Sequence, residues 1–457
     1  MDGIGSASLP ERYRSLDIWR GIACFLVVLI HAFSLPNNLL NQTGPWSGFC
    51  RCIDSVACRL WIGVPIFFVI SGYCIGAAAD AHRRHRRPIH DFFVCRLRRV
   101  YLPYFVALAF TAGLVFVFDL VSAEHRLSEV GIPNPATLTP ANWFGNLTLT
   151  EGLMSGVPGH VVRRQLLPAW TLCHEVQFYV ISGVFLLVAS RHFFLALGAF
   201  TIFGGMAVGL AARFGVHLPQ GCVLRGTWLM FAMGIAVYWQ IAVGTRRARW
   251  LTIALLLVPL VWSLCHPQAL ITHESNNTQN IFISAITALL LVLAHPFDLA
   301  VTSRALAVPF AKLGKISFSV YLIHFPIIRF CDMQRTIWLG NNVPAGLLVL
   351  LATTILSVGA GSLFYRWVEC RTLGRSGKKQ TRWTSGDILY SRIRAEKGAE
   401  ESNVPVRSPR VPQGQPLAPR IEPAQPLDPN PSEWIQTPAQ RRNLGQRVPS
   451  HMRRDSQ

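Results

Sequence analysis

The first long apolar stretch of the chain carries two residues that could take part in catalysis. Arg20 and His31 lie in the segment SLDIWRGIACFLVVLIHAF, which starts at Ser15. Eleven positions separate them, and at about 100° per residue this spacing places both side chains on one helix face, about 16 Å apart along the axis. A histidine inside a membrane costs free energy unless it faces a cavity or a partner, so His31 indicates a functional site. The alternative is a structural histidine that bonds a neighbouring helix.

The two residue types suit proton transfer and the binding of an anion. A neutral imidazole can accept a proton from a hydroxyl group. An arginine keeps its charge in almost every setting and binds phosphate with two parallel hydrogen bonds.

Further polar residues lie in other apolar segments. They are Ser71 and Tyr73, then Arg96, Arg98 and Arg99, then Trp170 and Glu175, and finally Tyr321 and His324. The arginines could bind donor phosphates, although such a cluster also anchors a helix at the cytoplasmic surface. A carboxylate about seven residues, or roughly 10 Å, inside a helix needs a partner or water, which favours a functional Glu175. His324, three residues after Tyr321 on one face, is either a second functional histidine or a bond between helices.

The composition indicates that membrane helices position these residues. The chain has 457 residues, of which 51% are hydrophobic and 14% charged. Soluble domains carry about 25% charged residues, so this deficit favours a polytopic membrane protein. The net charge of +20 comes mainly from arginines in short loops and in the tail. That distribution is typical of membrane topology and is a poor argument for a nucleic-acid partner.

Ten apolar segments are long enough to span a bilayer. They cover residues 16–36, 58–79, 100–121, 169–190, 193–212, 223–243, 250–265, 279–299, 314–334 and 344–367, and Pro259 weakens the seventh. Because alternate loops are rich in arginine, the positive-inside rule places both termini in the cytoplasm. We predict an all-α fold, a polytopic transmembrane bundle of about ten spans within residues 1–375.

The regions outside the spans carry three further predictions. Residues 376–457 are rich in Pro, Arg and Gln and should form a disordered cytoplasmic tail. The long outer loop, residues 122–168, is either a lid, an acceptor-binding surface or a plain connector. Cys50, Cys52 and Cys58 cluster in one loop, where a disulfide depends on the compartment that it faces. Cysteine spacing gives no metal motif, and we predict no metal site.

In order and wording, these stretches resemble the membrane-bound acyltransferase family 3, bacterial O-acyltransferases that modify cell-surface glycans. The resemblance runs from about Arg14 to about Cys370. Arg20 and His31 match the family pattern of an arginine, ten residues and a histidine, and FFVISGY, RLRRVYLPY, WTLCHEVQFY and SFSVYLIHFPI follow in the family order. The pair Ile18 and Trp19 and the long Pro/Arg tail depart from the family. The chain looks like the short form, with no esterase-like domain after the last span.

The resemblance implies a reaction and a set of roles. An acyl group, most often acetyl from acetyl-CoA in the cytoplasm, would move to a hydroxyl of a surface or secreted glycan or glycolipid. His31 would be the general base, or a transient acyl carrier. Arg20 would bind CoA phosphate, and Glu175, on the opposite side, would orient the acceptor or tune His31. Weaker donor-binding candidates are Arg96, Arg98 and Arg99, and the residues lining the site would be Asp17, Ser71, Tyr73, Trp170, Tyr321 and His324.

The expected location is the bacterial inner membrane, in contact with its lipids. A secondary transporter or exporter of a glycan or lipid intermediate is the alternative, since buried Arg, His and Glu also relay protons. Donor dependence separates the two, because a transporter does not consume acetyl-CoA. The sequence leaves open which glycan is the acceptor, whether the acyl group is larger than acetyl, and the oligomeric state.

Overall fold

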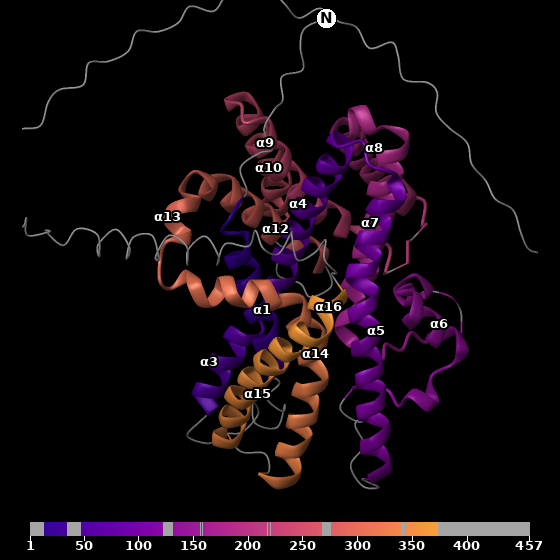
Figure 1. Cartoon of the computed structure of the whole chain (residues 1–457), viewed down its shortest axis with the longest axis vertical. Helices are drawn as coiled ribbons and strands as arrows, with labels where there is room; N and C mark the ends of the chain where they lie inside the picture. Colours follow the sequence, from indigo (N-terminus) through magenta and orange to yellow (C-terminus); the bar gives the residue numbers. More distant parts are fainter. Residues whose placement is uncertain are drawn as a thin grey trace, which may run out of the picture. The chain divides into compact units, whose positions relative to one another are not determined.

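The computed structural model describes residues 13–33, 47–121, 131–155, 157, 159–216, 218–219, 221–266, 276–339 and 343–372. Within these residues every regular element is a helix and none is a strand (Figure 1). The predicted tail, residues 376–457, lies outside the described residues. The all-α fold is confirmed for the part of the chain that can be compared.

Eight helices of the described part are long and apolar enough to cross a membrane. They are Arg51–Arg84, Ile89–Asp119, Leu167–Val188, Ser190–Ala211, Arg246–Cys265, Asn277–Thr302, Ala307–Arg335 and Ala345–Thr372. Eight of the ten predicted segments coincide with them, including the seventh, which keeps Pro259 inside α10 (Arg246–Cys265). The other two are α1 (Leu16–Ala32) and α9 (Thr227–Val243), helices of 17 residues each. At 1.5 Å per residue these two are about 26 Å long, slightly less than the apolar core of a bilayer.

Helix α1 packs along α14 (Ala307–Trp338), and the two run in the same direction (Figure 1). Gly21 and Gly314 form the crossing point. A β-carbon on Gly21 would overlap the carbonyl oxygen of Phe310, and one on Gly314 would overlap that of Asp17. Small residues allow two membrane helices to approach until their backbones touch. This contact fixes α14 against the helix that carries Arg20 and His31.

A second close crossing at glycines joins α4 (Gly63–Arg84) to α9. A β-carbon on Gly72 would overlap the carbonyl oxygen of Phe231, and one on Gly234 would overlap that of Val69. Beside this crossing, Phe178 of α7 (Trp170–Val188) stacks on Phe231 with ring centroids 4.1 Å apart. Aromatic and aliphatic side chains of α4, α5 (Ile89–Val121), α7 and α9 form the largest hydrophobic cluster. These four helices therefore share a well-packed hydrophobic core.

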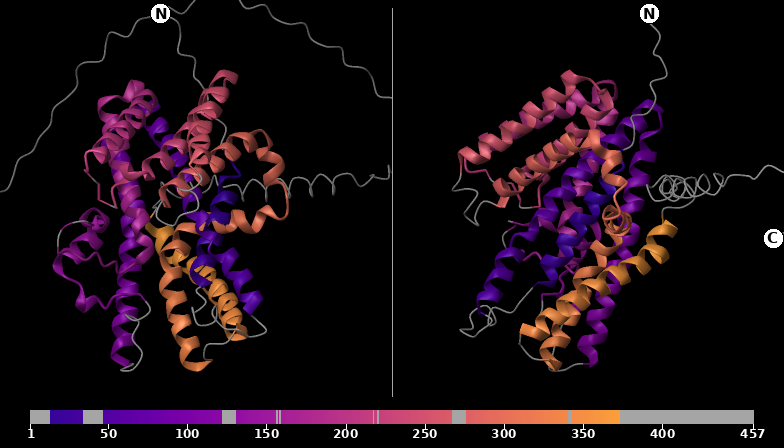
Figure 2. Two further views of the ribbon diagram at one scale, coloured as in Figure 1. Left: turned by 180° about the vertical axis from the view of Figure 1, so that it is seen from behind. Right: turned by 90° about the vertical axis from the view of Figure 1, so that its left-hand side faces the viewer.

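The last helices return toward α5. Helix α15 (Val343–Phe364) lies beside α14 in both views of Figure 2. It continues through a π-helical turn, Tyr365–Glu369, into α16 (Cys370–Thr372), and both short elements contact α5. A π-helical turn rotates the following side chains relative to the preceding helix, and such turns are frequent at functional sites. The remaining helices are α3 (Ser47–Ala57), α8 (Phe193–Arg213), α12 (Asn276–Ala294) and α13 (Asp298–Thr302).

The long connection before α7 has a polar framework of its own. It contains α6 (Pro140–Thr148) and a short turn, Glu151–Met154. The side-chain oxygen of Asn142 accepts the Arg163 N–H at 3.0 Å, and that of Asn146 accepts the Gln165 N–H at 2.9 Å. The connection ends with Pro168, whose carbonyl oxygen accepts a 2.7 Å hydrogen bond from the Tyr321 hydroxyl. Because Tyr321 is in the middle of α14, helix α7 begins inside the bundle.

Candidate active site

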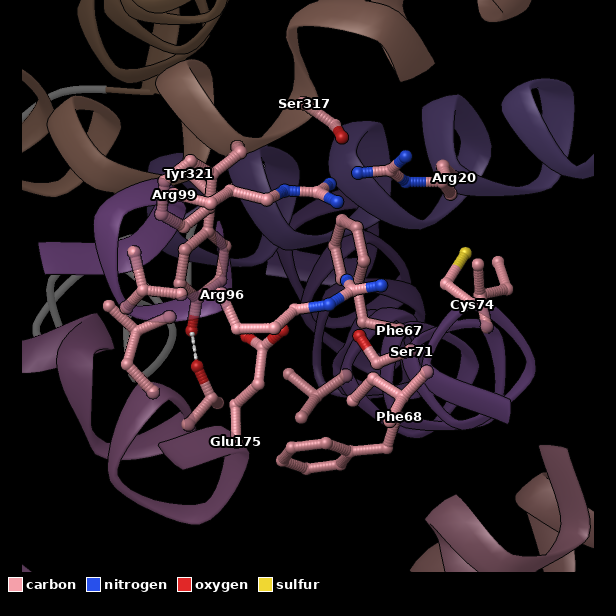
Figure 3. Close-up of a pocket in the computed structure, with 17 residues that line it drawn as sticks. Arg20, Phe67, Phe68, Ser71, Cys74, Arg96, Arg99, Glu175, Ser317 and Tyr321 are labelled. Carbon is pink, nitrogen blue, oxygen red and sulfur yellow. Dashed lines mark hydrogen bonds between the residues drawn. The ribbon is translucent and has the colours of Figure 1, made fainter. Parts of the chain in front are cut away.

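A pocket brings together five helices, α1, α4, α5, α7 and α14 (Figure 3). Its polar lining consists of Arg20, Ser71, Arg96, Arg99, Thr171, Glu175, Ser317 and Tyr321. Most of the remaining lining is apolar and includes two phenylalanine rings of α4. Residues that are 300 positions apart in the sequence thus share one space. Six of the predicted site residues are among them.

Three guanidinium groups converge in this pocket. Figure 3 shows Arg20 from α1 and Arg96 and Arg99 from α5 pointing into the same space. Arg96 and Arg99 are three residues apart, so they share a helix face. Arg98 is exposed and is not part of the lining, because a step of two residues turns a side chain about 200° away from Arg96. Like charges repel strongly where water is scarce, so this arrangement suits an anionic ligand.

Glu175 faces the arginines from α7. Its carboxylate accepts a hydrogen bond from Tyr179, which is buried one turn further along the helix. The guanidinium of Arg96 lies over the Tyr179 ring, 5.9 Å from its centroid. We expected Glu175 on the side opposite Arg20, and the two residues instead line one pocket. The reason is that α7 begins inside the bundle, so its first turns lie at the level of the pocket.

His31 belongs to a second cluster, beyond the pocket along α1. It lies in the last turn of the helix, and its ring centroid is 5.3 Å from those of both His324 and Phe325. His324 is fully buried, and its Nδ1 is 2.8 Å from the carbonyl oxygen of Tyr321. A carbonyl oxygen only accepts, so Nδ1 carries a proton in this bond. Within the described residues the Nε2 of His324 is buried and has no hydrogen-bond partner.

Tyr321 lies between the two clusters. Its ring lines the pocket, with the Phe67 ring 5.9 Å away on one side and the His324 ring 5.7 Å away on the other. Its hydroxyl lies 2.7 Å from the Pro168 carbonyl oxygen and 2.7 Å from the Thr171 hydroxyl, and it hydrogen-bonds with both. Two hydrogen bonds therefore hold this ring at the end of the arginine pocket.

Three predicted residues lie elsewhere. The ring of Tyr73 faces Tyr13 and Tyr238, with centroids 6.0 and 5.4 Å away. Trp170 packs at 6.1 Å from the Phe68 ring, and Asp17 is buried where α1 meets α14. The pocket lining does not include Tyr73, Trp170 or Asp17. They support the helices that carry the lining residues.

Sequence reasoning missed two charged residues near the clusters. Glu369 is buried on the π-helical turn and accepts a 2.5 Å hydrogen bond from the Ser319 hydroxyl. It interacts electrostatically with Arg99 and Arg20, so it is a second carboxylate beside the arginines. The predicted last span stopped at residue 367, two positions too early to include it. Arg329 lies two residues after the SFSVYLIHFPI stretch, within the ninth predicted span.

Two predictions concerned cysteines and metals. Cys52 and Cys58 are exposed free thiols, and the side chain of Cys50 is outside the described residues. Among the residues that the structure describes, no group of three or more His, Cys, Asp or Glu side chains is placed to hold a metal ion.

The structure is a multi-pass helical bundle with basic and imidazole side chains inside its spans. The acyltransferase domain family, acyltransferase family 3, matches residues 13–362, and the chain belongs to this family. It is a membrane-bound O-acyltransferase. The match covers every helix that lines the pocket.

Two curated relatives are similar to the chain. A protein described as the membrane-bound transacylase BcsY, from Komagataeibacter xylinus, is 26% identical over 352 residues, covering 76% of this chain and 81% of the relative. The O-acetyltransferase OatA from Staphylococcus aureus is 22% identical over 334 residues, covering 68% of this chain and 52% of the relative. The chain thus spans about half the length of OatA. No solved structure matches the chain significantly.

Proposed function

We propose that this protein transfers an acetyl group from acetyl-CoA to a hydroxyl of a cell-surface or secreted glycan or glycolipid. The observation that carries the proposal is the position of two clusters on one face of α1. Arg20 marks the arginine pocket and His31 the histidine pair, about 16 Å further along the helix. The shape of acetyl-CoA fits two separated clusters, because a long, flexible pantetheine arm separates its phosphates from the thioester.

The arginine pocket is the donor-binding part of this proposal. Arg20, Arg96 and Arg99 bind the phosphate oxygens with charge-assisted hydrogen bonds. Glu175 holds the arginines in place through its own charge and its hydrogen bond with Tyr179. Arg98, which is exposed on the other side of α5, is left out of the site. The phosphates stay in the arginine pocket, and the pantetheine arm extends past Tyr321 with the acyl group at its end.

His31 is the general base. It takes the proton of the acceptor hydroxyl while the alcohol oxygen attacks the carbonyl carbon of the thioester. The carbon–sulfur bond then breaks, and the proton goes to the leaving thiolate. The name of OatA, an O-acetyltransferase, supports acetyl as the group transferred, and that of BcsY supports transfer between two carriers.

The arginine pattern of the loops supports a location in the bacterial inner membrane with both termini in the cytoplasm. In that orientation the amino-terminal part of α1, with Arg20, is on the side where acetyl-CoA is made. His31 then lies toward the opposite surface, where a glycan acceptor or a lipid-linked glycan is presented. The membrane lipids surround the apolar helices and serve as the solvent of the bundle.

The test uses membrane vesicles with the cytoplasmic face outward, prepared from cells that make the acceptor glycan. Acetyl-CoA with a ¹³C-labelled acetyl group is added outside, and the glycan is analysed by mass spectrometry. We expect labelled acetyl esters with the wild-type chain and none with His31→Ala at equal membrane abundance. The matched control is His85→Ala, which changes an exposed histidine beyond the end of α4.

Two results would contradict the proposal. Equal labelling by His31→Ala would show that His31 is structural. Movement of unlabelled glycan across the vesicle membrane, with no consumption of acetyl-CoA, would favour the exporter alternative.

A further inference from the structure

An arginine lies next to the histidine pair, inside the membrane-spanning part of α14. Arg329 follows His324 by five residues and is half-buried. Its guanidinium lies over the Phe325 ring, 5.1 Å from the centroid. The same ring meets the His31 ring edge to face at 5.3 Å. Phe325 therefore contacts both a cation and the proposed base.

Arg329 shares its acidic neighbour with a second arginine. The acid that interacts with it, Asp332, is bound to Arg335, with 2.9 Å between Nη2 and Oδ1. The Nε–H of Arg329 is buried and donates no hydrogen bond within the described residues. A cation and a buried donor without a partner both cost free energy in a membrane helix, so such residues usually serve a function.

The position of the Arg329 charge beside His31 indicates which function this arginine has. Arg329 interacts electrostatically with His31, and the buried Nε2 of His324 has no hydrogen-bond partner within the described residues. The guanidinium and the proposed base therefore share the Phe325 ring as a neighbour. A fixed guanidinium near the base is suited to a negative charge that forms at the reacting carbonyl.

We propose that Arg329 is a catalytic residue that stabilises the oxyanion of acyl transfer. When the alcohol oxygen attacks the thioester, the carbonyl π electrons move to oxygen and form a tetrahedral oxyanion. The Arg329 guanidinium donates hydrogen bonds to that oxygen. The electrons then return, the carbon–sulfur bond breaks and the thiolate leaves. This inference rests on the proposed function, because it needs an acyl donor at His31.

A charge that exists only in the transition state gives a specific kinetic signature. Loss of one oxyanion donor lowers kcat by about 10²- to 10³-fold, while substrate binding is unchanged. An arginine that bound an anionic acceptor would show the reverse pattern, with a raised acceptor KM. The two patterns distinguish a catalytic Arg329 from a substrate-binding one.

The experiment compares Arg329→Gln, Arg329→Lys and the wild-type chain in the vesicle assay. The control is Arg304→Gln, an exposed arginine before α14. Acetyl-CoA binding is measured separately by equilibrium binding of labelled donor. We expect Arg329→Gln to lower kcat by about 10²-fold or more with both KM values within about twofold. We expect Arg329→Lys to recover part of kcat, and donor binding to equal that of the wild type.

Each alternative outcome has a definite meaning. A raised acceptor KM with normal kcat, or unchanged kinetics, would overturn the role of Arg329. Weak donor binding by both variants would show that Arg329 only maintains the fold, and would also overturn it. If neither the wild type nor Arg304→Gln transfers acetyl, the proposed function fails before the inference is reached.

Discussion

The ring of Tyr321 lies 5.7 Å from the ring of His324, and the same side chain lines the arginine pocket. One residue therefore belongs to both clusters of the site. Its hydroxyl is held by Pro168 and Thr171 at the start of α7, so the ring is fixed between the two clusters. In the proposed function, an acyl donor bound by the arginines extends past this ring toward His31.

The two neighbouring arginines of α5 should behave differently. Replacement of Arg99 by Gln removes a charge-assisted hydrogen bond to donor phosphate, which is worth about 1.5–3 kcal/mol. We expect the acetyl-CoA KM to rise by about 10- to 100-fold, whereas Arg98→Gln should change it less than twofold. Donor titrations in vesicles measure both. Equal losses in the two variants would mean that general basic charge on α5, rather than the pocket, binds the donor.

The crossing of α1 and α14 should tolerate no side chain at its centre. Gly314→Ala places a methyl group against the Asp17 carbonyl, and such overpacking costs typically 1–3 kcal/mol. We expect a lower Tm and loss of activity. The control is Gly113→Ala on α5, where a β-carbon meets nothing within 4 Å. Alanine there should be neutral or stabilise by about 0.5–1 kcal/mol. Similar Tm values for both variants would argue against a close crossing.

A pH effect on stability is expected from Glu151, which lies outside the membrane-spanning segments. Burial raises the pKa of this carboxyl above its ordinary value, and the Arg164 guanidinium, 3.2 Å away, offsets only part of the rise. The folded protein therefore keeps a proton at pH values where the unfolded chain has released it. The resulting stabilisation is complete below the unfolded pKa and is lost as pH rises through the folded pKa.

Glu151→Gln isolates this contribution, because glutamine does not titrate. We expect the Tm of the wild type, relative to that of the variant, to fall as pH increases from about 4 to about 7. Thermal unfolding in detergent at several pH values measures the difference. A constant difference across this range, or one that grows with pH, would contradict the raised pKa.

The helical fold could be predicted because its cause is local. Runs of apolar residues long enough to cross a bilayer must be helical, since each backbone group needs a partner within its own segment. The shared face of Arg20 and His31 also followed from spacing alone. The same helical periodicity turns Arg98 away from Arg96 and Arg99, so spacing by itself argues against Arg98 as a residue of the pocket.

The depth of each helix in the bundle could not be predicted from its own sequence. Glu175 reaches the arginines because Pro168 is held by Tyr321, a residue more than 150 positions away. Glu369 comes beside the arginines because a π-helical turn extends the last helix past its apolar run. The local sequence around Glu175 or Glu369 predicts neither contact. Both depend on which distant helices are neighbours.

The backbone contact at Gly21 and Gly314 has a consequence for how the enzyme opens. Helix α1 carries both Arg20 and His31, and this contact joins it closely to α14, which carries Tyr321 and His324. Helices α5 and α7 carry Arg96, Arg99 and Glu175, the charged groups that face Arg20 across the pocket. Swinging these helices outward would split the arginines between two bodies. A phosphate that bridges them would draw the bodies together, so the substrate itself would close the enzyme around its own thioester.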